Sequence, residues 1–116
     1  MPYKQRDVVK ISAQLPDGNT ATHPFVIISC GVANSRENFY TGVMMTGSTH
    51  KDVFSFSIAD SMFESPLEKG NCHIRLYILT SFREIQVTKF VSRMKKAFFV
   101  QLVKQITEIT FKVDND

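Results

Sequence analysis

The spacing of apolar residues changes once along this chain, and that change constrains the fold more than any other feature. Between residues 7 and 87, apolar side chains fall at alternate positions in short runs separated by Gly, Pro, Asn and Asp. A period of two residues predicts β-strands. Between residues 92 and 110 the apolar spacing becomes three to four residues, which is the period of an amphipathic helix. We therefore expect a mainly β domain that ends in one helix.

The predicted strands are short. In the first strand, Val9 and Ile11 share one face with Ala13 and Leu15. The second is a continuous apolar run, which favours burial on both faces. The expected strands cover residues 7–15, 25–30, 39–46, 53–58 and 72–79, and Ile85 with Val87 would add a short sixth. Such strands predict a small, curled antiparallel sheet or barrel that the helix caps.

The segments between the strands are polar. Residues 19–23 contain one apolar side chain and predict a flexible loop, and residues 31–38 predict turns. Residues 47–52 predict a hairpin-like connection between the third and fourth strands. Ser92 is the expected N-cap of the terminal helix. In the fifth strand, we expect Ile74, Leu76 and Ile78 to share the core face.

Length and composition limit the class of protein. The chain has 116 residues, and we expect one domain over residues 1–116. Its 43% apolar and 22% charged residues are typical of globular proteins and exclude disorder. No apolar run approaches the roughly 18 residues that span a bilayer, and no apolar signal segment follows the N-terminus. Cys30 and Cys72 are expected to be reduced and buried, which predicts a cytoplasmic protein without membrane contact.

The sequence contains no motif for a metal or a cofactor. His23, His50 and His73 are far apart, and no pair has the i, i+4 spacing of a helix. Neither cysteine belongs to a CxxC or Cys/His pattern, and no Gly-rich phosphate loop is present. We therefore expect neither a metal ion nor a cofactor.

The chain is mildly basic. Its formal net charge is +3 and its pI is about 9.0. No acidic residue occurs from Ile85 to Thr107. The cations of this segment form either an ordinary solvated helix face or an electrostatic footprint for RNA or an acidic protein segment. They are Lys89, Arg93, Lys95, Lys96 and Lys104.

Two groups of residues combine side chains that could bind a phosphate or take part in its cleavage. Residues 46–51 follow a predicted strand and offer hydroxyls, an imidazole and an ammonium, which suit an anion. A solvated loop would have the same composition. His73, Arg75 and Tyr77 alternate on one face of the fifth strand. They join a titratable group, a fixed cation and a stacking ring, as RNA contacts do, although an ordinary exposed sheet face fits as well.

Several short segments follow one another in an order that is similar to that of a known protein family. These segments are Arg6 to Val9, the Pro-Asp-Gly turn at 16–18, His23 to Ser29, Gly42 to Ser48, and the strand from Cys72 to Phe82 before the closing helix. Over nearly the whole chain they resemble toxins of the PemK/MazF type. The resemblance implies an SH3-like barrel that is usually a homodimer and cleaves single-stranded RNA at specific sequences without a metal ion. It also implies a cognate antitoxin whose acidic tail blocks the toxin's site.

The resemblance assigns roles to individual residues. Thr46 matches the family's strand-end threonine, which binds or orients the scissile phosphate. Arg75 matches an arginine that some members use to stabilise charge or to donate a proton. His23 stands where the family has the arginine before proline, and Arg6 stands where it usually has glycine. The expected catalytic residues are Arg75, Thr46, His23 and His50, and the expected RNA contacts are Ser48, Lys51, His73 and Tyr77.

Two other functions fit the same residues. A non-catalytic SH3-like barrel would bind nucleic acid or a peptide through His73, Arg75 and Tyr77, because such folds serve many functions. A small single-strand nucleic-acid binder of the OB type fits the basic charge, and fits the long closing helix less well. Thr46 and Arg75 favour the ribonuclease, whereas His23, Tyr77 and Ile78 favour the binding module.

Overall fold

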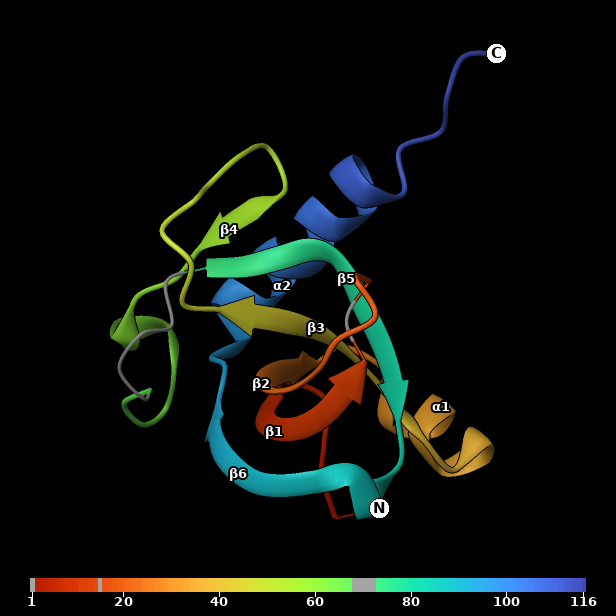
Figure 1. The fold of residues 1–116 in the computed structure, drawn as a ribbon, viewed down its shortest axis with the longest axis vertical. Helices are drawn as coiled ribbons and strands as arrows, with labels where there is room; N and C mark the ends of the chain where they lie inside the picture. Colours follow the sequence, from red (N-terminus) through yellow and green to blue (C-terminus); the bar gives the residue numbers. More distant parts are fainter. Residues whose placement is uncertain (1, 15, 68–72) are drawn as a thin grey trace.

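The computed structural model describes residues 2–14, 16–67 and 73–116, without the side chain of Ala13 (Figure 1). Leu15 and Cys72, which the sequence analysis assigns to strands, lie outside the described residues. The strands are β1 (Asp7–Gln14), β2 (Thr20–Ile27), β3 (Tyr40–Thr46), β4 (Ser55–Ser57), β5 (His73–Phe82) and β6 (Val87–Arg93). The helices are α1 (Gly31–Glu37) and α2 (Lys96–Gln105), and single turns are η1 (Asp60–Met62), η2 (Glu84–Gln86) and η3 (Ile106–Thr110). The prediction of a mainly β fold with a C-terminal helix is confirmed.

The six strands form one antiparallel sheet in the order β4-β5-β3-β2-β1-β6. The sheet curls, and the chain that follows η1 reaches the end of β6 (Figure 1). There Phe63 forms an isolated antiparallel bridge with Met94, and the N–H of Glu64 donates to the carbonyl of Arg93 at 2.8 Å. These contacts join the chain that follows the edge strand β4 to the end of the other edge strand, β6.

Both faces of the sheet are buried, because successive residues of a strand enter opposite core layers. In β2, Phe25 and Ile27 pack on one side with Tyr40, whereas Val26 packs on the other side with Leu76. The three β2 residues are fully buried, which confirms the prediction of a strand buried on both faces.

Helix α2 covers one face of the sheet through apolar residues at helical spacing. Phe99, Leu102 and Ile106 are buried in the core layer that contains Leu76. Burial of each such side chain contributes about 1.5–3 kcal/mol. Beyond α2, the hydroxyl of Thr110 donates to the carbonyl of Leu76 at 2.8 Å. Packing and this hydrogen bond together fasten the C-terminal segment to β5.

The terminal helix begins later than predicted. Residues 87–93 belong to β6, and the helix starts at Lys96. Ser92 is buried in β6 and is not an N-cap, because its hydroxyl donates to the carbonyl of Ser65 at 2.9 Å. Met94 follows the helical spacing because the end of β6 and the helix bury side chains in the same core layer.

Three loop predictions are wrong. Strand β2 already begins at Thr20, because backbone pairing with β1 needs no apolar side chains there. Residues 31–37 form α1, which ends at Asn38 with a φ of 59°. Residues 47–52 do not form a hairpin connection, because β4 pairs with β5 and not with β3.

Three predictions for single side chains are also corrected. Cys30 is exposed and not buried. Ile85 is 90% exposed in η2, so the sixth strand begins after it. Ile78 packs against a different core layer from Ile74 and Leu76, because an irregularity in the β3–β5 pairing shifts the alternation.

Arg6 adopts a backbone conformation that favours glycine. Its φ is 82°, and the left-handed region costs a residue with a Cβ about 1–2 kcal/mol. We expect Arg6→Gly to be more stable than Arg6→Ala by about 1 kcal/mol in urea unfolding. Both variants lose the same hydrogen bond, from Nη1 of Arg6 to the carbonyl of Met94, so the comparison isolates the backbone. Equal stabilities of the two variants would contradict the assigned conformation.

Candidate functional site

Six of the eight predicted site residues lie around one pocket. The pocket has a volume of about 260 Å³ and lies where β3 ends and β5 begins, because Thr46 pairs with His73. This pairing joins the two groups of residues that the sequence analysis singled out. The lining consists of Met44, Thr46, Ser48, His50, His73, Arg75, Tyr77 and Ile78.

In the loop after β3, backbone N–H groups donate hydrogen bonds to side-chain hydroxyls. The N–H of Ser48 donates to Oγ1 of Thr46 at 3.2 Å. The N–H of His50 donates to Oγ of Ser48, also at 3.2 Å. Each hydroxyl therefore accepts a bond from the residue two positions later, which holds the loop folded above the end of β3.

Arg75 is held in place by a carboxylate. Its Nη1 and Nη2 donate to Oδ1 and Oδ2 of Asp52 at 3.0 and 3.2 Å, and Nη1 also donates to Oγ of Ser55 at 3.1 Å. The hydrogen bond from Arg75 holds the pKa of the Asp52 carboxyl below its usual value. The guanidinium is therefore a fixed cation that already binds a two-oxygen anion in the bidentate geometry.

An aromatic surface continues from Arg75. The guanidinium carbon lies 4.9 Å from the centroid of the Tyr77 ring, and Phe54 meets that ring edge-on at 5.1 Å. Tyr77 is 47% exposed. Thr110 completes a second hollow of about 420 Å³ beside these residues. An exposed ring next to a cation is a suitable surface for an unstacked base.

His73 is buried, whereas the sequence analysis expected it to project from the sheet with Arg75 and Tyr77. Its exposed fraction is 0%, and neither ring nitrogen has a hydrogen-bond partner among the described residues. Burial lowers the pKa of His73, and the positive charges of Arg75 and Lys51 lower it further. His73 therefore forms a neutral floor of the pocket near pH 7.

This burial predicts a loss of stability in mild acid. The unfolded chain takes up a proton near pH 6.5, whereas folded His73 resists protonation. Stability should therefore be full above pH 6.5 and fall below it, by up to about 1.4 kcal/mol per pH unit. Urea unfolding at several pH values between 7.5 and 5.5 measures the effect, and His73→Gln should flatten it. The same slope in the variant would assign the effect to other groups.

His23 and Lys51 are outside this lining. Half-buried His23 pairs with Ile11 in the β1–β2 ladder. The antiparallel β2–β3 pairing ends at Phe25 and Met44. His23 precedes Phe25 by two residues and Thr46 follows Met44 by two residues, so both lie beyond the same end of this pairing. Exposed Lys51 influences the pKa of His73, so its charge lies within electrostatic reach of the pocket.

Three residues that hold Arg75 and Tyr77 were not predicted from the sequence: Asp52, Phe54 and Ser55. One signal for Asp52 was available, because it is the only acidic residue between Glu37 and Asp60. A lone carboxylate in a long segment without other acidic residues indicates a partner for a cation. Its partner was hidden, because β4 meets β5 through a pairing that residue spacing does not show.

Two findings concern metals and membranes. Within the part of the chain that the structure describes, no group of three or more His, Cys, Asp or Glu side chains could hold a metal ion. Among the same residues, no helix combines the length and the apolar character needed to cross a bilayer.

Comparisons with known proteins identify the fold. No protein-family model and no curated protein matches the chain. Among solved structures, it is similar to a mycobacterial endoribonuclease in complex with its cognate antitoxin, with a TM-score of 0.73, 8% identity and coverage of 98% of this chain and 99% of that one. It is also similar to a MazE-MazF structure from Deinococcus radiodurans, with a TM-score of 0.72, 7% identity and coverage of 97% and 100%.

A third structure agrees with these two. The toxin MazF-mt6 of Mycobacterium tuberculosis has a TM-score of 0.63 and 13% identity, over 91% of this chain and 98% of that one. The chain therefore has the fold of MazF-type endoribonuclease toxins. This confirms the predicted fold class, a mainly β barrel of the MazF type with a C-terminal helix.

Proposed function

We propose that this chain is the toxin of a type II toxin–antitoxin system and that it cleaves single-stranded RNA in the cytoplasm without a metal ion. Residues 1–116 would form one MazF-like domain. The observation that carries the proposal is the pocket at the end of β3, which brings a fixed guanidinium together with an imidazole and two hydroxyls. The MazF-type fold supports the same function.

Metal-free cleavage of RNA needs a base, an acid and donors for the phosphoryl oxygens. The 2′-oxygen loses its proton to the base and attacks the adjacent phosphorus. The bond from phosphorus to the 5′-oxygen breaks, and the acid protonates that oxygen. The products are a 2′,3′-cyclic phosphate and a 5′-hydroxyl.

The pocket can supply these contributions from its own side chains. Arg75 would bind a phosphoryl oxygen through guanidinium N–H groups that do not bond to Asp52 or Ser55, and Thr46 and Ser48 would anchor the same phosphate. His50 lines the pocket with them, so we propose His50 and His23 as the acid–base pair without assigning the order.

The surroundings of the pocket would bind the rest of the RNA. Tyr77 and Phe54 would stack an unpaired base. Lys51 would attract the backbone. His73, whose exposed fraction is 0%, would form the floor beneath the bound RNA group and would not contact it directly.

An acidic antitoxin is the proposed protein partner. Two of the similar solved structures are complexes of a toxin with its antitoxin. This chain has a net charge of +3, and no acidic residue occurs from Ile85 to Thr107. A disordered acidic segment would be attracted to such a surface and would compete with RNA for the cations.

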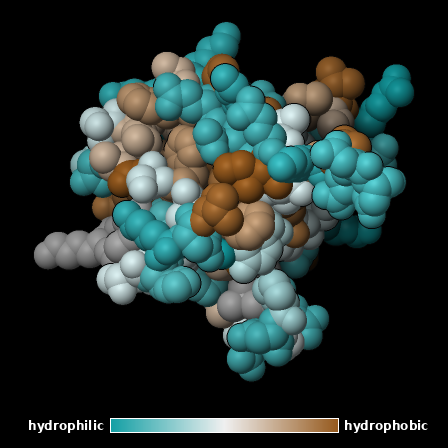
Figure 2. All heavy atoms as spheres, turned by 90° about the horizontal axis from the view of Figure 1, so that it is seen from above, coloured by the Kyte–Doolittle hydropathy of each residue, from teal (hydrophilic) through white to brown (hydrophobic). Residues whose placement is uncertain are grey.

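We also propose that the chain forms a homodimer. Large apolar side chains are exposed on α2 and after it, and Figure 2 shows a group of apolar side chains on the face at the C-terminal end of the molecule. Burial in a partner would remove this surface from water. Light scattering should give twice the chain mass of 13.2 kDa. A monomer at about tens of micromolar would count against the dimer. The exposed residues are Val100, Val103, Phe111 and Val113.

A cleavage assay tests the proposed function. The purified protein should cut a mixed-sequence single-stranded RNA in the presence of EDTA and leave the DNA of the same sequence intact, because DNA lacks the 2′-hydroxyl. Thr46→Ala should slow cleavage by about 10–100-fold, the value of a hydrogen bond to a charged group. Thr49→Ala is the matched control, because this hydroxyl is outside the pocket lining. If the wild type leaves the RNA uncut, the non-catalytic binding module becomes the better explanation.

A further inference from the structure

A separate pocket lies near the opposite end of β3 from the candidate active site. We call it the basic pocket, and its volume is about 510 Å³. Tyr3 in its lining donates its N–H to the hydroxyl of Tyr40 at the start of β3, whereas Thr46 at the end of β3 lines the candidate active site. A strand of this length spans about 20 Å, at roughly 3.3 Å per residue. The two pockets are therefore separate sites.

The lining of the basic pocket contains no carboxylate among the described residues. It contains four cations, which are Lys4, Arg6, Arg93 and Lys96. Within the described part of the chain, no carboxylate forms an ion pair with Lys4, Arg6 or Lys96. Lys96 is the first residue of α2, whose first turn contains no acidic residue, so the positive end of the helix adds to the same potential.

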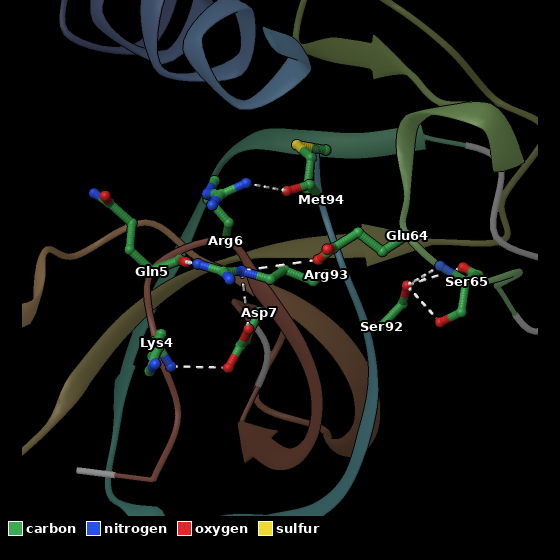
Figure 3. Close-up of polar contacts among 9 residues, drawn as sticks. All are labelled: Lys4, Gln5, Arg6, Asp7, Glu64, Ser65, Ser92, Arg93 and Met94. Carbon is green, nitrogen blue, oxygen red and sulfur yellow. Dashed lines mark hydrogen bonds and ion pairs between the residues drawn. The ribbon is translucent and has the colours of Figure 1, made fainter. Parts of the chain in front are cut away.

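Arg93 is fixed at the edge of this pocket (Figure 3). Its Nε lies 3.5 Å from Oδ1 of Asp7 and 4.0 Å from Oε2 of Glu64, and Nη2 donates to the carbonyl of Gln5 at 3.4 Å. Asp7 is itself held, because Oδ2 accepts the N–H of Lys4 at 2.8 Å. The charge of Arg93 is thus compensated by Asp7 and Glu64. Lys4, Arg6 and Lys96 can therefore interact with an anionic ligand in the pocket.

Arg6 is the most unusual residue of the basic pocket. Its φ of 82° would suit glycine, so a side chain is present here at a cost in backbone energy. That side chain is ordered, because Nη1 donates to the carbonyl of Met94 at 3.1 Å (Figure 3). Strained backbone that places a charged group in a cavity is typical of a functional site.

We propose that the basic pocket binds the phosphomonoester group of a nucleotide or of an RNA 5′ end. A phosphomonoester carries nearly two negative charges near pH 7, so it suits a pocket that several cations line better than a single carboxylate does. The hydroxyl of Ser35 adds a donor, and the ring of Tyr3 adds an aromatic wall for the attached nucleoside. The volume lies within the range of small-molecule sites, about 300–1,000 Å³. This binding breaks no bond and is independent of the proposed ribonuclease activity.

Calorimetric titration with adenosine 5′-monophosphate tests the proposal on the whole chain. This probe contains no phosphodiester, so the result does not depend on whether the protein cleaves RNA. The nucleotide should bind at least about tenfold more tightly than adenosine. Arg6→Gly, whose backbone fits the native φ, and Lys96→Ala should each weaken binding by about tenfold, the value of one charge-assisted hydrogen bond. Lys104→Ala is the control, because this exposed lysine of α2 pairs with Glu108 outside the pocket.

A second arm distinguishes the two sources of the phosphate. A short RNA with a 5′-phosphate is compared with the same RNA ending in a 5′-hydroxyl. If the 5′-phosphate makes the RNA bind more tightly than its 5′-hydroxyl form, the ligand is an RNA end, whereas equal binding of the two RNAs together with binding of the mononucleotide indicates a free nucleotide. Equal binding of adenosine and its monophosphate would overturn the proposal. So would unchanged nucleotide affinity in both Arg6→Gly and Lys96→Ala, or occupation of the pocket by a glutamate-rich peptide that the nucleotide does not displace.

Discussion

Replacement of Arg75 by alanine is expected to lower the rate of RNA cleavage by about 10²–10³-fold, the usual loss on removing one positioned charge stabiliser. Arg75 lines the candidate active site with Thr46 and His50. Asp52 holds the guanidinium at 3.0 and 3.2 Å, so it needs little rearrangement to meet the developing charge. The measurement is the initial rate on a single-stranded RNA at pH 7 in EDTA.

Two controls separate the role of Arg75 from general effects of charge and folding. Arg75→Lys keeps a positive charge but loses the bidentate geometry, so it should retain part of the rate. Arg36→Ala removes an exposed cation from α1 and should keep the wild-type rate. Circular dichroism must show that Arg75→Ala is folded, because the substitution also breaks the ion pair with Asp52. A folded Arg75→Ala variant that cuts RNA at the wild-type rate would mean that the site lies elsewhere.

Leu102→Ala is expected to reduce the free energy of unfolding by about 2–5 kcal/mol. Leu102 is 0% exposed and belongs to the core layer between α2 and the sheet. Truncation would leave a cavity, because the strands on one side cannot move into the space. Since domains of this size are stable by only about 5–15 kcal/mol, the variant should unfold at a clearly lower urea concentration.

Gln101→Ala on the same helix is the matched control. Gln101 is exposed and lies outside the apolar surface assigned to the dimer, so its truncation should change stability by less than about 0.5 kcal/mol. The pair therefore tests which face of α2 packs against the sheet. A larger loss for Gln101→Ala than for Leu102→Ala would contradict this orientation.

The strands and the terminal helix could be predicted from the sequence because their burial pattern is local. Alternation in β1, the apolar run in β2 and the spacing of Phe99, Leu102 and Ile106 each reflect one buried face. The pairing of β4 with β5 could not be predicted, because strand order depends on contacts between distant segments. Helix α1 was missed because its only buried residue is the polar Asn34, so no apolar period marks it.

The candidate site was predicted in part for the same reason. Thr46 and Arg75 stand on strands whose alternation is visible, and the β3–β5 pairing brings them to one pocket. Asp52 was missed because an ion pair between a loop and a strand leaves no periodic signal. The burial of His73 was missed because alternation gives the face of a side chain and not what covers that face.

The chemical identity of the cleaved ends tests the central claim most directly. Attack by the 2′-hydroxyl leaves a 2′,3′-cyclic phosphate on one fragment and a 5′-hydroxyl on the other. The fragments downstream of each cut in a single-stranded RNA, produced in EDTA, are therefore expected to accept a 5′-phosphate from a polynucleotide kinase without prior dephosphorylation. Their upstream partners should carry the cyclic phosphate in mass spectrometry. Fragments with 5′-phosphate and 3′-hydroxyl ends, or RNA that stays intact, would contradict the assignment of this pocket as a metal-free ribonuclease site.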